Sequence, residues 1–167
     1  MLKTKIAVFV SGGGTNFEAL INAQENGKIP HGEIVLMVSS SRTAYALKRA
    51  ENHGIKSVVC SKKELGSQEK FEEEILKNLE ENDIQLIVLA GFMSILSNEF
   101  TKKYENRIIN IHPSLIPSFC GEGFYGLHVH EAALKKGVKV TGATVHIVNE
   151  IPDGGPIICL LYTSPSP

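Results

Sequence analysis

The 167-residue sequence has no tryptophan, only three cysteines and no long apolar run. Cys60, Cys120 and Cys159 are far apart and form no CxxC pair, which argues against a disulfide framework or a zinc knuckle and indicates a reducing compartment. The apolar run after Lys5 ends at Ser11, too early for a signal peptide or a membrane span. We therefore expect a cytoplasmic protein with no membrane partner.

The sequence also lacks an excess of either charge. Lys and Arg number 17 and Asp and Glu number 18, so the formal net charge is -1. This balance argues against broad attraction to nucleic acid. The length suits one domain with a core of its own, and the 43% hydrophobic content is ordinary for a globular protein.

Short apolar runs alternate with segments of helical periodicity along the chain. This order predicts an α/β fold with a mostly parallel sheet and helices on both faces. Strands are expected at 6–10, 34–38, 57–60, 86–90, 108–111, 144–148 and 156–161. Helices are expected from Phe17 to just before Gly27, over 44–53, 67–81 and 129–136, and around Phe100.

The chain changes character at Tyr162, where a Thr-Ser-Pro-Ser-Pro sequence follows the last apolar run. One interpretation is a natural disordered tail. We favour a truncation or a foreign joining sequence, because the expected sheet stops in the middle of a strand. The sequence thus predicts a domain over 1–161 that is incomplete at its C-terminus, and a tail over 162–167.

A glycine-rich turn, Ser11-Gly12-Gly13-Gly14-Thr15-Asn16, joins the first strand to the first helix. Its backbone N–H groups and the helix dipole favour a phosphate, although the same residues also suit a simple tight turn. No Gly-Lys-Ser/Thr follows, and Phe17 replaces the third glycine of a dinucleotide site. A phosphorylated small molecule therefore fits this turn better than ATP or NAD.

Asn110 and His112 come two residues apart at the end of a predicted strand, so both project to the same face. An amide donor beside an imidazole suits acyl transfer, because one can stabilise a developing oxyanion while the other moves a proton. The alternative is a polar strand end without a role. Asp153, on a Gly-Gly loop, either orients His112 or is only a turn residue.

Two other site types use residues of the same region. His112, His146, His128, His130 and Cys120 are residue types that bind metals, but no pair has the HExxH spacing. Cys120 with a histidine is a second alternative, as a nucleophilic pair. Neither pattern is specific.

Taken in order, four motifs resemble the phosphoribosylglycinamide formyltransferases of purine synthesis, over about residues 5–158. These motifs are Ser11-Gly-Gly-Gly-Thr-Asn16, Ala90-Gly-Phe-Met-Ser-Ile-Leu96, Asn110-Ile-His-Pro-Ser-Leu-Ile-Pro117, and Thr144-Val-His146 through Asp153-Gly-Gly-Pro156. Such a resemblance implies a Rossmann-like formyltransferase fold. It also implies formyl transfer from 10-formyltetrahydrofolate to a small-molecule amine, N1-(5-phospho-D-ribosyl)glycinamide, without a metal.

The resemblance assigns roles to single residues. It implies a catalytic trio of Asn110, His112 and Asp153. The phosphate loop of the ribonucleotide site would comprise Gly14, Thr15 and Asn16. The folate site would comprise Met93, Ser94, Ile95, Leu96, Asn110, Asn149, Glu150, Ile151, Pro152 and Asp153.

Related enzymes leave alternatives. A formyltetrahydrofolate hydrolase and a non-catalytic phosphometabolite-binding domain both stay open, whereas a tRNA formyltransferase would be expected to carry a further basic domain.

Two residues depart from the family's pattern. Gln68 stands where some relatives have a basic residue that we associate with the folate glutamate tail, and Pro152 stands where an apolar residue is usual.

Overall fold

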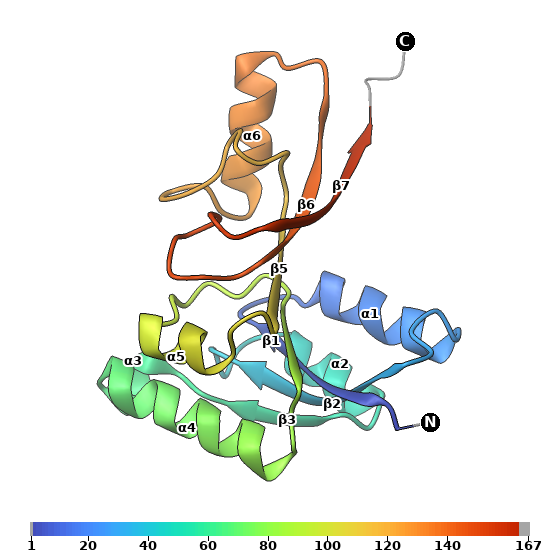
Figure 1. Cartoon of the computed structure of the whole chain (residues 1–167), viewed down its shortest axis with the longest axis vertical. Helices are drawn as coiled ribbons and strands as arrows, with labels where there is room; N and C mark the ends of the chain where they lie inside the picture. The colour runs from blue at the N-terminus through green and yellow to red at the C-terminus, as the bar shows by residue number, and fades with distance from the viewer. Residues whose placement is uncertain (1, 164–167) are drawn as a thin grey trace. The chain divides into compact units, whose positions relative to one another are not determined.

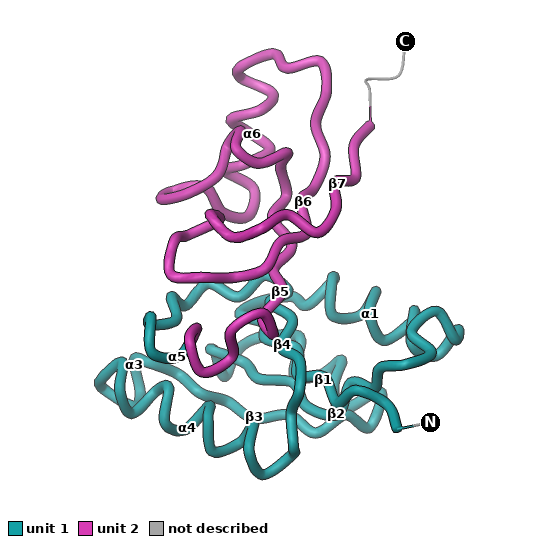
Figure 2. Tube along the Cα trace, in the orientation of Figure 1, with its two compact units in different colours: residues 1–100 teal, residues 101–167 magenta. Residues whose placement is uncertain are grey.

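The computed structural model describes residues 2–163, which form two compact units, residues 2–100 and residues 101–163 (Figure 2). Unit 1 alternates strands and helices, as predicted. Its elements are β1 (Thr4–Val10), α1 (Thr15–Glu25), β2 (Gly32–Ser39), α2 (Ala46–Asn52), β3 (Lys56–Val59), α3 (Lys62–Leu65), α4 (Gln68–Glu81) and β4 (Leu86–Leu89). Helix α5 (Asn98–Lys103) spans the boundary between the units.

The strands of unit 1 pair with one another in parallel, with β1 between β2 and β4 and β3 beside β2. Their apolar runs are buried on both faces. Ile6, Val8 and Val10 of β1 pack with Phe17 and Ile21 of α1 and with Ala46 and Ala50 of α2. Since these positions recur every two residues along the strand and every four along the helices, the two periodicities place them in one core.

The alternate strand residues form the opposite face. Ala7 and Phe9 are fully buried there, as are the α4 residues Phe71, Ile75 and Leu79, which recur every four positions. In Figure 1 α1 and α4 lie on different sides of these strands. Unit 1 is therefore a parallel sheet with helices on both faces, as the sequence predicted.

Unit 2 pairs its strands in antiparallel fashion, which the sequence did not indicate. Strand β5 (Ile108–His112) pairs with β6 (Thr141–Ile147), and β6 pairs with β7 (Ile157–Thr163). Helix α6 (Leu127–Lys136) follows a loop that begins at Pro113, as expected from the proline and glycine content.

Two local expectations differ from the structure. The four-residue helix α3 was not expected, because so short a segment carries no apolar periodicity. Strand β7 runs through Tyr162 and Thr163, two residues past the expected end of the strand. Both are exposed, so the strand continues there without burial. Residues 164–167 of the expected tail lie outside the described residues, and a domain limit at 161 stays a prediction.

Candidate active site

The pairing of β5 with β6 brings the predicted strand-end residues to a second histidine. In this antiparallel register Asn110 lies opposite His146 and His112 lies opposite Thr144. The Asn110 Nδ2 atom is 3.1 Å from His146 Nε2. The buried Thr144 hydroxyl donates to the Ser114 carbonyl at 2.7 Å and accepts from the Ile116 N–H at 3.0 Å, so it fixes the turn after His112.

Asp153 lies between the two imidazoles. Its Oδ2 atom is 3.5 Å from His112 Nδ1, and its Oδ1 atom is 3.5 Å from His146 Nε2. The Gly121 N–H also donates to Oδ2, at 2.9 Å. The structure thus brings together all three residues of the expected trio, with His146 as the link between Asn110 and Asp153.

The environment of Asp153 favours its ionised form. Burial by itself would raise the pKa of this carboxyl, but the contact with His146, the Gly121 N–H and the charges of the two imidazoles together hold the pKa below its usual value. Asp153 therefore stays a carboxylate at neutral pH.

The loop that carries Asp153 is tightly folded. Asp153 has φ of 54°, in the left-handed region that aspartate tolerates better than most residues. A side chain at Gly155 would collide with the Ile147 carbonyl oxygen, because the backbone of the loop returns directly onto β6. The Asp153-Gly154-Gly155 motif is thus needed to bring the carboxylate back to the strand.

Hydrogen-bond partners determine where the two imidazoles carry protons. His112 Nε2 lies 2.8 Å from the Phe119 carbonyl oxygen, which can only accept, so Nε2 carries a proton. A second proton on Nδ1 would face Asp153. His146 Nδ1 donates to the Ile147 carbonyl at 2.9 Å, and its Nε2 faces the Asn110 amide at 3.1 Å and the Asp153 carboxylate at 3.5 Å.

Sequence reasoning gave His146 a role only in the metal alternative, although the residue stands in one of the four motifs of the resemblance. Its side chain is 2% exposed and contacts two residues of the trio, so the structure adds it to this cluster. A signal was present, because Thr144 and His146 are polar residues two apart in an apolar strand. That signal cannot be used without knowing which strand pairs with β6.

In unit 1, the predicted folate segment 93–96 follows β4 and is held by α4. The Gln68 amide donates to the Ile95 carbonyl at 3.0 Å. The buried Glu72 carboxylate accepts from both the N–H and the hydroxyl of Ser97, each at 2.6 Å. Met93 and Ile95 are exposed, and their contact with a folate stays a prediction.

Ser11 ties the glycine-rich turn to that segment. Its hydroxyl oxygen accepts from the Met93 N–H at 2.8 Å and from the Ser40 hydroxyl at 2.6 Å. Helix α1 begins directly after the turn, with Gly14 as its N-cap in the left-handed region. The predicted residues Thr15 and Asn16 are exposed at the first turn of this helix.

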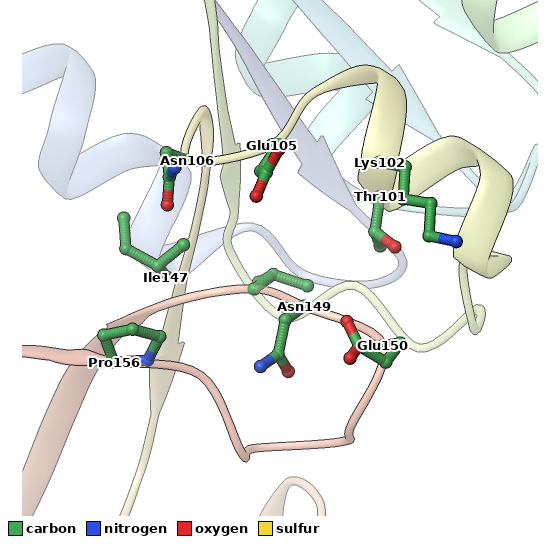
Figure 3. A pocket seen from close by; sticks show the side chains of 9 residues that line it. Thr101, Lys102, Glu105, Asn106, Ile147, Asn149, Glu150 and Pro156 are labelled. Atoms are coloured by element: carbon green, nitrogen blue, oxygen red, sulfur yellow. The ribbon is translucent and has the colours of Figure 1, made fainter.

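A pocket of about 600 Å³ lies in unit 2 beside the predicted residues Asn149 and Glu150 (Figure 3). The end of α5 and the following turn supply one side, with Thr101, Lys102, Glu105 and Asn106. Its volume is in the range of small-molecule sites. Ile151 and Pro152 of the same loop are exposed and do not line this pocket.

The two competing site types find no support among residues 2–163. No group of three or more His, Cys, Asp or Glu side chains in that range is placed to hold a metal ion, and His128 and His130 are exposed. Burial, with a smaller effect of Asp153, raises the pKa of the Cys120 thiol, whose Sγ atom donates to the Pro117 carbonyl. A raised pKa disfavours the thiolate that a nucleophilic cysteine needs.

None of the helices in the described range is long and apolar enough to cross a membrane. That the reaction needs no metal and that the protein is cytoplasmic both stay predictions.

Comparison with known proteins identifies the family. The model of the formyl transferase family matches residues 4–164. The chain is 47% identical, over 93% of its length, to the chicken trifunctional purine biosynthetic protein adenosine-3, and spans 15% of that protein. It is 39% identical to the phosphoribosylglycinamide formyltransferase of Haemophilus influenzae, over 92% of this chain and 70% of that protein.

Solved structures agree with the fold. The phosphoribosylglycinamide formyltransferase of Bacillus halodurans superposes with a TM-score of 0.88 at 39% identity, covering 98% of this chain and 81% of that one. The enzyme of the same name from Coxiella burnetii, in complex with CHES, gives a TM-score of 0.89 at 39% identity, covering 99% and 74%. The chain belongs to the formyl transferase family, among the phosphoribosylglycinamide formyltransferases.

Proposed function

We propose that this protein transfers the formyl group of 10-formyltetrahydrofolate to the amine of N1-(5-phospho-D-ribosyl)glycinamide. The products are the N-formyl ribonucleotide and tetrahydrofolate, in de novo purine (IMP) biosynthesis. The observation that carries this proposal is the cluster in which Asp153 joins His112 to His146 and His146 joins Asn110, in a chain whose relatives carry that name.

The cluster supplies what formyl transfer to an amine requires. The amine nitrogen attacks the formyl carbon, and the carbonyl oxygen becomes an oxyanion. The Asn110 carboxamide has two N–H groups, so one can bond His146 while the other stabilises the oxyanion. Collapse of the intermediate breaks the bond to N10 of the folate, which takes up a proton as it leaves.

His112 is the second donor to the oxyanion. In the ligand-free chain its Nε2–H donates to the neutral Phe119 carbonyl. An oxyanion is a stronger acceptor than a carbonyl, so exchange of that bond for one to the intermediate favours the transition state over the ground state. Asp153, as a carboxylate, stabilises the imidazolium and assists transfer of the proton that the amine loses.

Each predicted group of residues has its own part in substrate binding. Gly14, Thr15 and Asn16 bind the phosphate of the ribonucleotide through backbone N–H groups at the start of α1. The folate-binding residues that the family resemblance implies are Met93, Ser94, Ile95, Leu96, Asn110, Asn149, Glu150, Ile151, Pro152 and Asp153. No metal takes part. The reaction is placed in the cytoplasm, with small molecules as the partners.

The test is a spectroscopic assay of folate release, with and without the ribonucleotide. The proposal expects release that depends on the ribonucleotide and falls at least about 100-fold in His112→Ala, the typical effect of losing one oxyanion donor. Affinity for both substrates in that variant should change only a few-fold.

Three outcomes would point elsewhere. Release without any acceptor would assign a hydrolase. Ligand binding without release would assign a binding domain. Full activity in His112→Ala would remove His112 from the mechanism. His128→Ala is the matched control, because His128 is exposed and its Nδ1 atom lies 3.5 Å from Glu131, outside the cluster.

A further inference from the structure

Helix α2 holds the backbone of the glycine-rich turn from one side. The Gly12 carbonyl accepts from the Ala46 N–H at 3.2 Å. The Gly13 carbonyl accepts from the side-chain Nε–H of Arg49 at 2.8 Å. A Cβ atom at Gly14 would lie 2.7 Å from the Ala46 Cβ, so the turn packs directly on this helix.

These bonds orient the N–H groups of the turn. In a trans peptide the C=O of one residue and the N–H of the next point in opposite directions. With the Gly12 and Gly13 carbonyls directed at α2, the N–H groups of Gly13 and Gly14 are directed away from it. Among residues 2–163 neither of these N–H groups has an acceptor. They are therefore available to an anion only while the carbonyls stay bound to α2.

Arg49 is itself held in place. Its Nη1 atom is 3.1 Å from Glu18 Oε2, its guanidinium lies 5.1 Å from the centre of the Tyr45 ring, and its side chain is 24% exposed. Glu18 belongs to the first turn of α1, directly after the glycine-rich turn. Arg49 thus bridges the turn and the helix that follows it, in a fixed geometry.

The same contacts make Arg49 a poor direct ligand for phosphate. Its Nε–H is committed to a carbonyl, and its charge is balanced by the adjacent Glu18 carboxylate. The pKa of Glu18 is lowered, chiefly by its ion pair with Arg49, so this carboxylate is ionised at neutral pH. An anion at the turn would therefore lie near the neutralised Arg49–Glu18 ion pair and not near an unpaired positive charge.

We infer that Arg49 is a positioning residue for the ribonucleotide, which acts through the Gly13 carbonyl to keep the N–H groups of the turn directed at the phosphate. This inference rests on the proposed function, since it takes the ribonucleotide phosphate as the ligand of the turn. Nothing in the motifs of the sequence points to Arg49, because it lies 36 residues from its partner Gly13.

Two substitutions separate this role from a direct charge contact. Arg49→Lys keeps the charge but loses the planar donor that reaches the carbonyl, and Arg49→Gln loses both. The KM of the ribonucleotide, measured at saturating donor, should rise about tenfold or more in both variants, as for a lost hydrogen bond from a charged donor. The KM of the folate donor and kcat should stay within about twofold.

Lys48→Gln is the matched control. Lys48 is the neighbouring residue of α2, is exposed, and pairs with Glu51 at 2.8 Å. It should leave every constant unchanged. Titration of the ribonucleotide into each protein by calorimetry gives the same comparison without turnover, and thermal melts show whether each variant folds.

Specific results would overturn the inference. Unchanged affinity in Arg49→Lys with a loss in Arg49→Gln would make Arg49 a charge contact to the phosphate. Equal losses for both substrates would make its role purely structural. If the Arg49 variants do not fold, Glu18→Gln decides: it must weaken ribonucleotide binding selectively, or the inference is wrong. A wild-type protein that binds the ribonucleotide but does not turn over would remove the proposed function alone, whereas one that does not bind it would remove both.

Discussion

His146 offers a pair of substitutions that separate its two nitrogens. Nδ1 bonds the Ile147 carbonyl of its own strand, whereas Nε2 faces Asn110 at 3.1 Å and Asp153 at 3.5 Å. The terminal amide of glutamine reaches about as far from the backbone as Nε2, and that of asparagine about as far as Nδ1. His146→Gln therefore keeps the contact with the cluster, and His146→Asn keeps only the contact with the strand.

The expected loss follows from the contacts. A hydrogen bond to a charged group contributes about 1.5 to 3 kcal/mol. If that energy holds Asn110 and Asp153 in the transition state, kcat/KM falls roughly 10- to 150-fold in His146→Asn, since each 1.36 kcal/mol is a factor of ten. His146→Gln should stay within about fivefold of the wild type.

The assay is kcat/KM as a function of pH. His146 helps to lower the pKa of Asp153, so its loss raises that pKa towards the ordinary value. The acid limb of the profile should move to higher pH in His146→Asn and stay in place in His146→Gln. Equal kcat/KM in His146→Asn and His146→Gln would refute the link between His146 and the catalytic pair. Two pH profiles that coincide with that of the wild type would refute it as well.

Two further predictions concern stability. Phe71→Ala removes a fully buried ring from α4 and should lower the free energy of unfolding by about 3 to 5 kcal/mol in urea denaturation; a loss below about 1 kcal/mol would mean that α4 is not packed as described. Contacts with Glu25 first and Glu18 second raise the pKa of His53 above 6.5. These contacts therefore stabilise the folded chain fully below about pH 6.5, and this stabilisation is lost as pH rises through the raised pKa of His53. The Tm deficit of His53→Ala should thus be larger at pH 6 than at pH 9. An equal deficit at both pH values would contradict this.

Much of the fold could be predicted, because apolar runs and helical periodicity report burial directly. The parallel strands of unit 1 and helix α4 follow from such patterns. Strand direction does not follow from such patterns, since a short run such as that of β6 has the same pattern in a parallel or an antiparallel strand. The antiparallel pairing of unit 2 therefore had no signal in the sequence. Helix α3 was missed because one turn of helix has no period.

Only some residues of the candidate site could likewise be predicted from the sequence. Asn110 and His112 could be paired from the two-residue period of one strand. Asp153 was joined to His112 as one of two interpretations of its loop, and to both residues by the family resemblance. His146 and Arg49 required knowledge of contacts between distant segments, because each acts on a residue 36 positions away. Local patterns identify the residues of a strand end or a turn, but the residues that position them become visible only in the fold.

The most direct test of the central claim follows the formyl carbon itself. The protein is incubated with 10-formyltetrahydrofolate labelled with carbon-13 at the formyl group and with the glycinamide ribonucleotide, and the products are identified by NMR. The account predicts that the label appears as an N-formyl group on the ribonucleotide, in amounts equal to the tetrahydrofolate released. Label recovered as free formate, with the ribonucleotide unchanged, would contradict it.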